Sequence, residues 1–422
     1  MNEEFSFMKL PEKIDFSEHV IGVYYLETSL SMEKAAESLA GEQSTGTWTK
    51  VYTETPEIHE EHGAKIVGYY ELPLSDANTR RGIVILAHPT INFGPQIPLM
   101  LSVVAGNLYE MKDFHSIKLL DLHFPREFVK DFQGPKFGVR GTREVLGVFD
   151  RPLVGTIIKP KAGMRPKALA DLCYHIARGG LDFIKDDEVY GPVKYAPLEE
   201  RVPLVMEAVD KANSEKNEKT LYAVNITDEV DKILENHDQV IKLGANCVML
   251  NFVTAGFSAL RVLAKHTKAP IHAHRDMFAA FTRVPTHGIS TAVVTKLARL
   301  AGADQLHIGA IQGKLYEPDE IVIASARTCL KEFHNITPCL PVSSGGQHAG
   351  KIAINCKLLG KDALILAGGG VLGHPKSIEA GALSMRQALE AYMKKIPARE
   401  YAEDKPELKI ALQTWGEVPV TF

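Results

Sequence analysis

From residue 152 onward, the sequence alternates regularly between short apolar segments and longer amphipathic segments. We predict eight strands, at residues 155–159, 181–185, 222–226, 247–252, 270–274, 305–308, 340–343 and 363–367. We predict helices near residues 166–178, 199–213, 229–242, 257–266, 289–301, 319–332, 348–358 and 377–394. Eight strand–helix units joined by right-handed crossovers are what an eight-fold barrel requires. The pattern predicts an α/β protein whose residues 146–422 form a (β/α)8 TIM barrel with a short C-terminal helical tail.

Residues 1–145 have a different, mixed pattern and are predicted to form a separate α+β domain of ferredoxin-like type. Strands are predicted at residues 19–26, 46–52, 65–72, 82–87 and 117–124. A helix is predicted at residues 31–40, where Ser31 is a suitable N-cap. Mixed strands and helices in this order favour an open sheet with helices on one face.

The overall composition argues against several classes of protein. A net charge of -4 is too small to favour a nucleic-acid partner. The cysteines are odd in number and form no CxxC pair, which argues against a disulfide framework and a structural zinc site. The N-terminus lacks a signal-peptide pattern, and no apolar run reaches membrane-spanning length. We therefore expect a cytoplasmic protein with neither a nucleic-acid nor a membrane partner.

The second predicted barrel strand ends in an unbroken run of charges. Leu181, Phe183 and Ile184 are followed directly by Lys185, Asp186, Asp187 and Glu188. In a strand, residues two apart share a face, so Lys185 and Asp187 should point together. Asp187 and Glu188 offer the hard oxygen ligands that Mg²⁺ prefers. The alternative interpretation is a solvated charge run at a strand end.

Other predicted barrel strands also end in residues capable of chemistry. Active sites of TIM barrels lie at the C-terminal ends of the strands. The candidates at these ends are Lys159 and Lys161, His274 and Arg275, His307 with Lys314 beyond it, Ser344 to Gly346, and Gly368 to Gly370. The triple glycine suggests a backbone cradle for phosphate. Each residue alone has an ordinary structural explanation, but together they predict an active site.

The nonapeptide GLDFIKDDE at residues 180–188 resembles the activation motif of the RuBisCO superfamily. In that family the lysine reacts with CO₂ to form a carbamate, which holds one Mg²⁺ together with the Asp and the Glu. The resemblance implies that Lys185 is the carbamylated lysine and that Asp187 and Glu188 are the other metal ligands.

Further segments resemble other motifs of the same family. GTIIKPK, at 155–161, implies that Lys159 is an acid/base and that Lys161 supports it. HAHRDM, at 272–277, implies that His274 contacts substrate hydroxyls and that Arg275 grips a phosphate. His307 matches a histidine that contacts phosphate and hydroxyl groups. The Ser344–Gly346 segment and Gly368 with Gly369 match phosphate-binding backbone; the resemblance assigns this role to Ser344, Gly345, Gly346, Gly368 and Gly369.

The resemblance also extends to a mobile loop and to the N-terminal domain. Residues 309–315 resemble a glycine-hinged lid that carries Lys314 over the site. Residues 42–48 and Asn107 resemble segments that, in the family, come from the partner subunit. The resemblance implies that Glu42 orients Lys314, that Thr47 and Trp48 cover a phosphate, and that Asn107 contacts a hydroxyl. A homodimer with shared sites and no small subunit is expected.

Three departures from a carboxylase stand out. Phe278 replaces a histidine near the second phosphate, Val189-Tyr190 replace polar residues, and Tyr316 interrupts the usual lid sequence. An apolar ring beside a phosphate disfavours a bisphosphate there. These changes resemble the RuBisCO-like proteins, which keep the metal site but act on other phosphorylated sugars.

We therefore predict a carboxy-lyase acting on a phosphorylated β-keto sugar acid such as 3-oxo-isoapionate 4-phosphate. The retained Glu42–Lys314 pair suits a substrate or product that bears a carboxylate. Ribulose-1,5-bisphosphate carboxylation is the second hypothesis, because nearly all of its machinery is present. A diketo-methylthiopentyl-phosphate enolase or methylthioribulose-phosphate isomerase is the third. A catalytically silent scaffold is disfavoured by the joint retention of Lys159, Lys185, Asp187, Glu188 and Lys314.

Overall fold

The computed structural model describes residues 7–76 and 78–422 and divides the chain into two compact units. The first unit comprises Met1–Phe132, Phe278–Leu297 and His334–Ile336. The second comprises Gln133–Met277, Ala298–Phe333 and Thr337–Phe422. In the part of the chain that is described, no helix is both long and apolar enough to cross a membrane.

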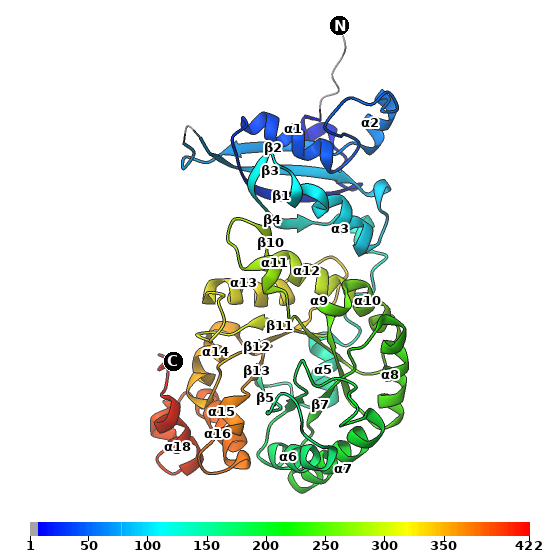
Figure 1. Cartoon of the computed structure of the whole chain (residues 1–422). Coiled ribbons are helices and arrows are strands. Elements are labelled where there is room, and N and C mark those ends of the chain that lie inside the picture. Colours follow the sequence, from blue (N-terminus) through cyan, green and yellow to red (C-terminus); the bar gives the residue numbers. More distant parts are fainter. Residues whose placement is uncertain (1–6, 77) are drawn as a thin grey trace. The chain divides into compact units, whose positions relative to one another are not determined.

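The first unit is built on a five-stranded sheet with the order β10-β4-β1-β3-β2 (Figure 1). Its strands are β1 (His19–Thr28), β2 (Lys65–Glu71), β3 (Arg80–Pro89), β4 (Phe114–His123) and β10 (Gly288–Ile289). Only the β10–β4 pair is parallel among these described strands. Along β1 every second residue is buried, as an amphipathic strand requires.

Helices accompany this sheet. They are α1 (Met32–Glu42), α2 (Pro56–His62), α3 (Ile97–Ala105), α4 (Arg126–Val129) and α11 (Ala279–Thr282), followed by α12 (Thr291–Ala301), which ends in the second unit. The predicted N-cap is confirmed, because the Ser31 side chain accepts a hydrogen bond from the Lys34 amide at 3.3 Å. Helix α1 packs on β2 and β3 through an apolar face that includes Ala36 and Leu39.

One strand prediction in this unit was wrong. Residues 46–52 form turns and bends rather than a strand. A half-buried strand needs one apolar face against a core, whereas the Trp48 and Tyr52 side chains are fully exposed. The chain here is held instead by turn contacts, with the Gly46 amide donating to Gly41 O at 2.9 Å and Thr45 Oγ1 donating to Glu54 at 2.7 Å.

The second unit is a closed barrel of eight parallel strands, in the order β11-β12-β13-β5-β6-β7-β8-β9, as predicted. The strands are β5 (Leu153–Ile157), β6 (Phe183–Lys185), β7 (Leu221–Asn225), β8 (Cys247–Asn251), β9 (Ile271–His274), β11 (Gln305–Gly309), β12 (Leu340–Ser344) and β13 (Leu364–Leu366). Every predicted barrel strand overlaps its observed counterpart, because each is a short apolar run bounded by polar or turn residues.

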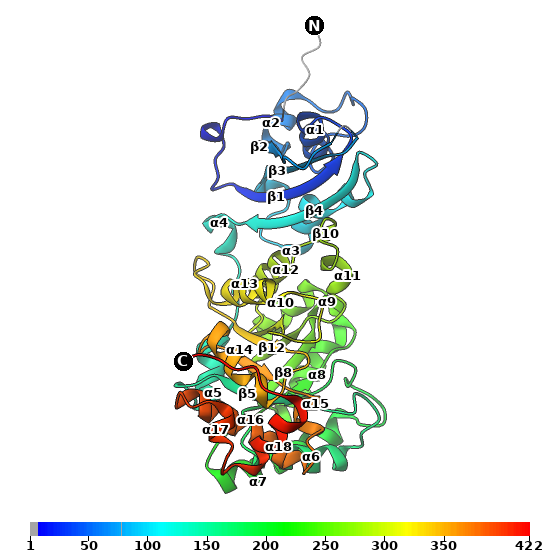
Figure 2. The same ribbon diagram turned by 90° about the vertical axis from the view of Figure 1, so that its left-hand side faces the viewer.

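Helices surround the barrel strands, and Figure 2 shows α16 and α18 beside one another. The helices are α5 (Gly138–Leu146), α6 (Pro166–Arg178), α7 (Leu198–Lys216), α8 (Val230–Lys242), α9 (Phe252–Ala255), α10 (Phe257–His266), α13 (Asp319–Leu330), α14 (Ile352–Leu359), α15 (Gly369–Leu372), α16 (Ile378–Met393), α17 (Ala398–Tyr401) and α18 (Pro406–Trp415). The C-terminal tail that was predicted to be helical carries two helices, α17 and α18.

The barrel interior is a packed apolar core rather than a channel. Side chains from alternating strand positions, among them Phe183, Met249 and Val342, fill it together with Leu146 from α5. Asp304, just before β11, is buried and accepts backbone hydrogen bonds from Phe137 at 2.6 Å, Gly138 at 2.7 Å and Ile271 at 2.8 Å. This carboxylate, at the start of β11, therefore links the start of α5 to the start of β9.

Candidate active site

The ends of β5 and β6 bring together five of the predicted site residues. Ile157 pairs with Lys185 in the parallel register, so Lys159 and Lys161 follow β5 where Asp187 and Glu188 follow β6. Lys159 Nζ donates to Asp187 Oδ2, and Lys161 Nζ lies 2.6 Å from Glu188 Oε1. Lys185 and Asp187 are fully buried. Two lysine–carboxylate pairs thus flank a buried lysine.

The Asp186 side chain has different partners from those of Asp187 and Glu188. Its carboxylate accepts hydrogen bonds from Tyr222 Oη at 2.7 Å and the Asn225 amide at 3.0 Å. The fully buried Arg201 lies 3.5 Å from the same carboxylate. The partners of Asp186 are therefore different from those of Asp187 and Glu188, which pair with Lys159 and Lys161. The contacts of Asp186 with Tyr222, Asn225 and Arg201 anchor the end of β6.

Two asparagines hold the backbone that carries the carboxylates. Asn225, the last residue of β7, donates to the carbonyls of Asp187 at 3.1 Å and Glu188 at 3.2 Å. Asn251, the last residue of β8, donates to Glu188 O at 2.8 Å. Neighbouring strand ends therefore fix the turn in which Asp187 and Glu188 lie.

Burial and charge oppose each other at this turn. Burial lowers the pKa of Lys185 to about 8, although Glu188 and Asp187 favour its charged form. Burial raises the pKa of Glu188, but hydrogen bonding from Lys161 and the charge of Lys185 outweigh it, so the net pKa lies below its ordinary value. The carboxylate is thus ionised, while the amine is close to the neutral form that can attack CO₂.

The residues at this turn fit a hard divalent cation. Asp187 and Glu188 supply anionic oxygens whose charge is now compensated by Lys159 and Lys161. Within the described chain, the buried Asn251 Oδ1 has no hydrogen-bond partner. Such an orphaned oxygen suits a bound water or cation. Lys185 itself repels a cation unless its amine is converted to an anionic group such as a carbamate.

Three histidines form a neutral cluster at the ends of β9 and β11. His272 Nδ1 is 2.9 Å from Gln305 Oε1, which is an acceptor, so His272 carries its proton on Nδ1. His272 Nε2, at 2.8 Å, then accepts from His307 Nε2. The His274 and His307 rings meet edge to face with centroids 4.6 Å apart, and His274 Nε2 lies 4.0 Å from Glu188. Burial lowers the pKa of all three histidines.

Arg275 forms an ion pair with a carboxylate of its own unit. Its guanidinium forms a two-pronged contact with Glu317: Nη2 donates to Oε2, and Nη1 lies 3.4 Å from Oε1. The side-chain exposures are 5% and 2%. The predicted phosphate-binding arginine is therefore already paired with an anion.

The loop after β11 contacts the loop after β12. The Lys314 amide donates to Gly345 O at 3.2 Å, and the Gln312 amide donates to Asp319 Oδ1 at 2.7 Å. A Cβ on Gly346 would lie 3.1 Å from Lys314 N. Glycine here thus admits the neighbouring loop, whereas the Lys314 side chain is exposed. The buried Ser344 ends β12 directly before this contact.

The glycines after β13 lie beside the end of β5. A Cβ on Gly368 would lie 3.4 Å from Lys159 Cε, so the bare backbone lets the lysine pass closely. Gly369 begins α15 and has open space around its Cα, whereas a Cβ on Gly370 would lie 2.3 Å from Gln347 O. Gly368 is therefore in close contact with Lys159, whereas Gly369 borders open space.

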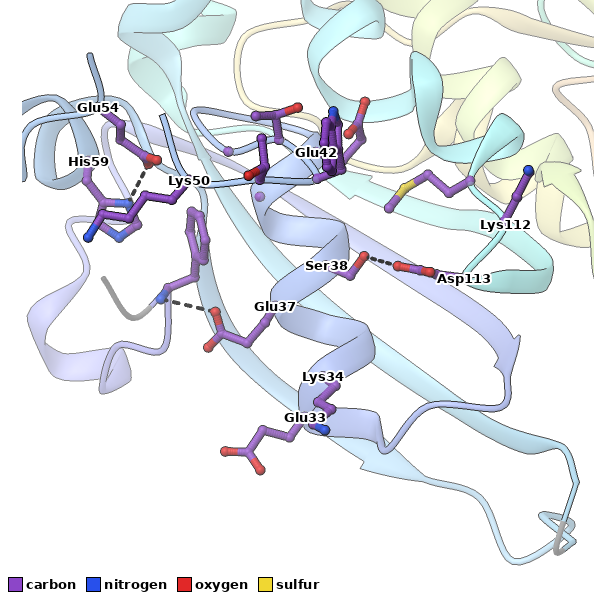
Figure 3. A pocket seen from close by; sticks show the side chains of 17 residues that line it. Glu33, Lys34, Glu37, Ser38, Glu42, Lys50, Glu54, His59, Lys112 and Asp113 are labelled. Atoms are coloured by element: carbon purple, nitrogen blue, oxygen red, sulfur yellow. Dashed lines mark hydrogen bonds and ion pairs between the residues drawn. The ribbon is translucent and has the colours of Figure 1, made fainter. Parts of the chain in front are cut away.

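The other predicted residues belong to the first unit. Asn107 Nδ2 donates to Glu42 Oε1 at 3.1 Å. Glu42, Thr47 and Trp48 line a pocket of about 930 Å³. Figure 3 shows this pocket, with the Ser38–Asp113 and Glu54–His59 contacts on its wall. Trp48 is 92% exposed, so its ring is available to a ligand or a partner chain.

A His–Asp–His cluster on the outer helices is satisfied by its own hydrogen bonds. Asp238 Oδ1 lies 2.9 Å from His237 Nδ1 and 2.6 Å from His266 Nε2. The Lys268 amide donates to His237 Nε2 at 3.2 Å, which leaves the His237 proton on Nδ1 for Asp238 to accept. These contacts account for the cluster as a hydrogen-bonded surface group.

Sequence reasoning missed Asp186, Arg201, Asn225, Asn251 and Glu317. Asn225 and Asn251 could have been found, because each is a polar residue at the end of an apolar run. Arg201 and Glu317 gave no such signal, since each lies in a charged segment typical of a solvated helix or loop.

Comparisons with known proteins agree with this geometry. Residues 138–415 match the family model for the ribulose bisphosphate carboxylase large chain, catalytic domain, and residues 11–128 match the model for its N-terminal domain. A ribulose bisphosphate carboxylase-like protein from Archaeoglobus fulgidus is 44% identical over 418 residues, which cover 96% of this chain and 95% of the relative. A 3-oxo-isoapionate-4-phosphate transcarboxylase/hydrolase from Xanthobacter autotrophicus is 37% identical over 412 residues, which cover 94% of this chain and 100% of the relative.

A solved structure shows the same likeness. The octameric ribulose-1,5-bisphosphate carboxylase/oxygenase from Pyrococcus horikoshii OT3 has a TM-score of 0.90 and 37% identity, covering 97% of this chain and 96% of that one. Both domains of the family are present here in the same order, and the match runs through nearly the whole of each relative. The chain therefore belongs to the ribulose bisphosphate carboxylase (RuBisCO) large-chain family.

Proposed function

We propose that this protein is an Mg²⁺-dependent carboxy-lyase that decarboxylates a phosphorylated β-keto sugar acid such as 3-oxo-isoapionate 4-phosphate. The observation that carries the proposal is the convergence of Lys159, Lys185, Asp187 and Glu188 at the adjoining ends of β5 and β6. The relative from Xanthobacter autotrophicus, a 3-oxo-isoapionate-4-phosphate transcarboxylase/hydrolase, supports this substrate class.

The proposed metal site is built on Lys185. In its neutral form the Lys185 amine attacks CO₂, forming an N–C bond and losing a proton, and so becomes an anionic carbamate. Asp187 and Glu188 would be the other protein ligands. A magnesium ion held there would supply positive charge that stabilises an enediolate as it develops.

The remaining residues would handle the substrate. When the carbon–carbon bond to the carboxylate breaks, its electron pair moves into the neighbouring ketone to form the enediolate, and CO₂ leaves. Lys159, whose side chain passes close to the backbone of Gly368, would deliver a proton to the carbon that has lost CO₂. Lys314, exposed on its loop, would contact the substrate carboxylate, which only the acid carries.

Ribulose-1,5-bisphosphate carboxylation is the second candidate, because it is the same bond change in reverse and because the similar Pyrococcus horikoshii protein is a carboxylase/oxygenase. An enolase or isomerase acting on methylthio sugar phosphates is the third. It would use Lys159 and the metal site but would have no carboxylate for Lys314 to contact.

We also propose a homodimer with shared sites. Glu42, Thr47, Trp48 and Asn107 lie around an open surface of the first unit, where a partner chain could be received. The octameric state of the Pyrococcus horikoshii relative supports an assembly of this kind.

A substrate panel tests the reaction. Phosphorylated β-keto acids and ribulose 1,5-bisphosphate are assayed for CO₂ release and for CO₂ fixation. Inhibition constants for an acid analogue and its neutral counterpart are then compared between wild type and Lys314→Met. We expect Lys314→Met to weaken only the acid analogue. Equal weakening of both analogues, or robust carboxylation of the bisphosphate, would refute the decarboxylase assignment.

A further inference from the structure

The arginine at the end of β9 is held in a buried ion pair. Arg275 directly follows β9, and Glu317 lies between the Lys314 loop and α13. Both side chains are almost fully buried, and two guanidinium nitrogens face the two carboxylate oxygens. This fork-to-fork arrangement is the one in which arginine binds carboxylate or phosphate most strongly.

The ion pair rests on the end of β11. Gly309, the last residue of that strand, has a φ of +104°, and a Cβ there would lie 2.9 Å from Glu317 Oε2 and 3.2 Å from Arg275 Nη2. The absence of a side chain at Gly309 lets the pair sit directly against the strand. The pair therefore lies at the C-terminal ends of β9 and β11, the side of a TIM barrel on which ligands bind.

The neighbouring histidines of β9 and β11 add no charge of their own. His307 and His272 are neutral at physiological pH, because burial lowers the pKa of each well below its ordinary value. If Glu317 lost its charge, the buried Arg275 would lose the counter-ion that now binds it in two-pronged fashion. A buried arginine in that state favours binding of an anion.

We infer that Glu317 is a specificity-determining residue that takes the place of a second anionic group of the substrate on Arg275. The site would then accept a sugar acid with one phosphate and an uncharged far end, and would reject a bisphosphate. A second phosphate could reach Arg275 only by displacing a carboxylate or by lying beside it with like charge. The inference rests on the proposed function only in placing the substrate at the barrel mouth.

The test compares ribulose 5-phosphate with ribulose 1,5-bisphosphate, which differ by one phosphate. Their dissociation constants are measured by calorimetry for wild type, Glu317→Gln and the control Glu320→Gln. Glu320 is exposed in the first turn of α13, so its substitution makes the same charge change nearby without touching Arg275. We expect Glu317→Gln to increase the preference for the bisphosphate by about 10- to 100-fold, and Glu320→Gln to behave as wild type.

A double variant tests whether Arg275 is the residue that binds the second phosphate. In Arg275→Gln/Glu317→Gln the gain in bisphosphate affinity should disappear, because the guanidinium that would bind the second phosphate is gone. If Glu317→Gln is too unstable to titrate, Glu317→Asp, with a carboxylate drawn back from Arg275, should show a smaller gain in the same direction. An unchanged bisphosphate preference in these single variants would overturn the inference and leave the pair as a structural tether. Because the readout is a ratio of binding constants, failure of CO₂ release in the substrate panel would leave this result independently interpretable.

Discussion

Lowering the pH from 7 to 5 is expected to destabilise the first unit through one histidine. His88, in β3, is fully buried, and its Nε2 lies 2.8 Å from Tyr24 Oη. Tyr24 Oη donates its own proton to Val104 O at 2.8 Å, so it accepts from His88 Nε2–H. His88 Nδ1 has no hydrogen-bond partner among the described residues. Protonation at Nδ1 would therefore place a charge in the core without compensation.

The size of the effect follows from the pKa of His88. Burial, with a smaller contribution from the charge of His19, lowers this pKa to about 3, from 6.5 in an unperturbed histidine. Between these values the unfolded chain binds a proton that the folded chain does not, so stability is lost as the pH falls below about 6.5. At pH 5 the expected loss from this residue is about 2 kcal/mol relative to neutral pH, rising to about 3 kcal/mol at pH 4.

Urea unfolding at pH 7 and pH 5 measures this loss, with the transition followed by circular dichroism. Other buried histidines also titrate, so the informative quantity is the difference between wild type and His88→Gln. The variant keeps an N–H for Tyr24 but cannot take up a proton, and it should lose about 2 kcal/mol less on going to pH 5. His115→Gln, at an exposed position in β4, is the matched control and should behave as wild type. Equal losses in wild type and His88→Gln would refute the reasoning.

Two further predictions concern the proposed site. Asp187→Asn should abolish both turnover and the thermal stabilisation that Mg²⁺ produces together with CO₂. The substitution removes a proposed anionic ligand, while Asp186 still anchors the strand end. A Mg²⁺-dependent rise in melting temperature that persists in the variant would contradict the metal assignment. Mixing inactive Glu42→Gln with inactive Lys185→Ala should restore activity through hybrid dimers, because each hybrid would hold one site with both residues intact. Activity that stays absent after mass spectrometry has demonstrated subunit exchange would argue against shared sites.

Much of the barrel could be predicted from the sequence because its strands are buried on all sides. A strand such as Cys247–Asn251 is uniformly apolar up to its last residue, so its end is marked by the first polar side chain. The chemistry of a TIM barrel lies at those same ends, and so the same signal made Lys159, Lys185 and Asp187 candidate site residues. Their spacing along the chain then placed them on adjoining strands.

The parts that could not be predicted depend on distant contacts. Residues 46–52 have strand-like composition, but whether they pair depends on a neighbouring sheet edge that their own sequence does not encode. The Arg275–Glu317 pair joins residues 42 positions apart. Each of its members, taken alone, has an ordinary explanation as a surface charge. Only the folded chain shows that both are buried.

The burial of the charged run at the end of β6 argues against the solvated interpretation. A solvated run at a strand end would leave its charges in water, yet Lys185, Asp186 and Asp187 are all fully buried. Taking such charges out of water costs several kcal/mol per ion even after the protein relaxes, and a packed apolar strand end would avoid that cost. For Asp186, the ion pair with Arg201 and the hydrogen bond from Tyr222 offset part of this cost, so its burial is explained by the stability of the fold. Asp187 pairs instead with Lys159, which follows β5, and Lys185 Nζ donates to Asp186 O at 2.7 Å. The proposed binding of a charged ligand would account for keeping these two charges buried.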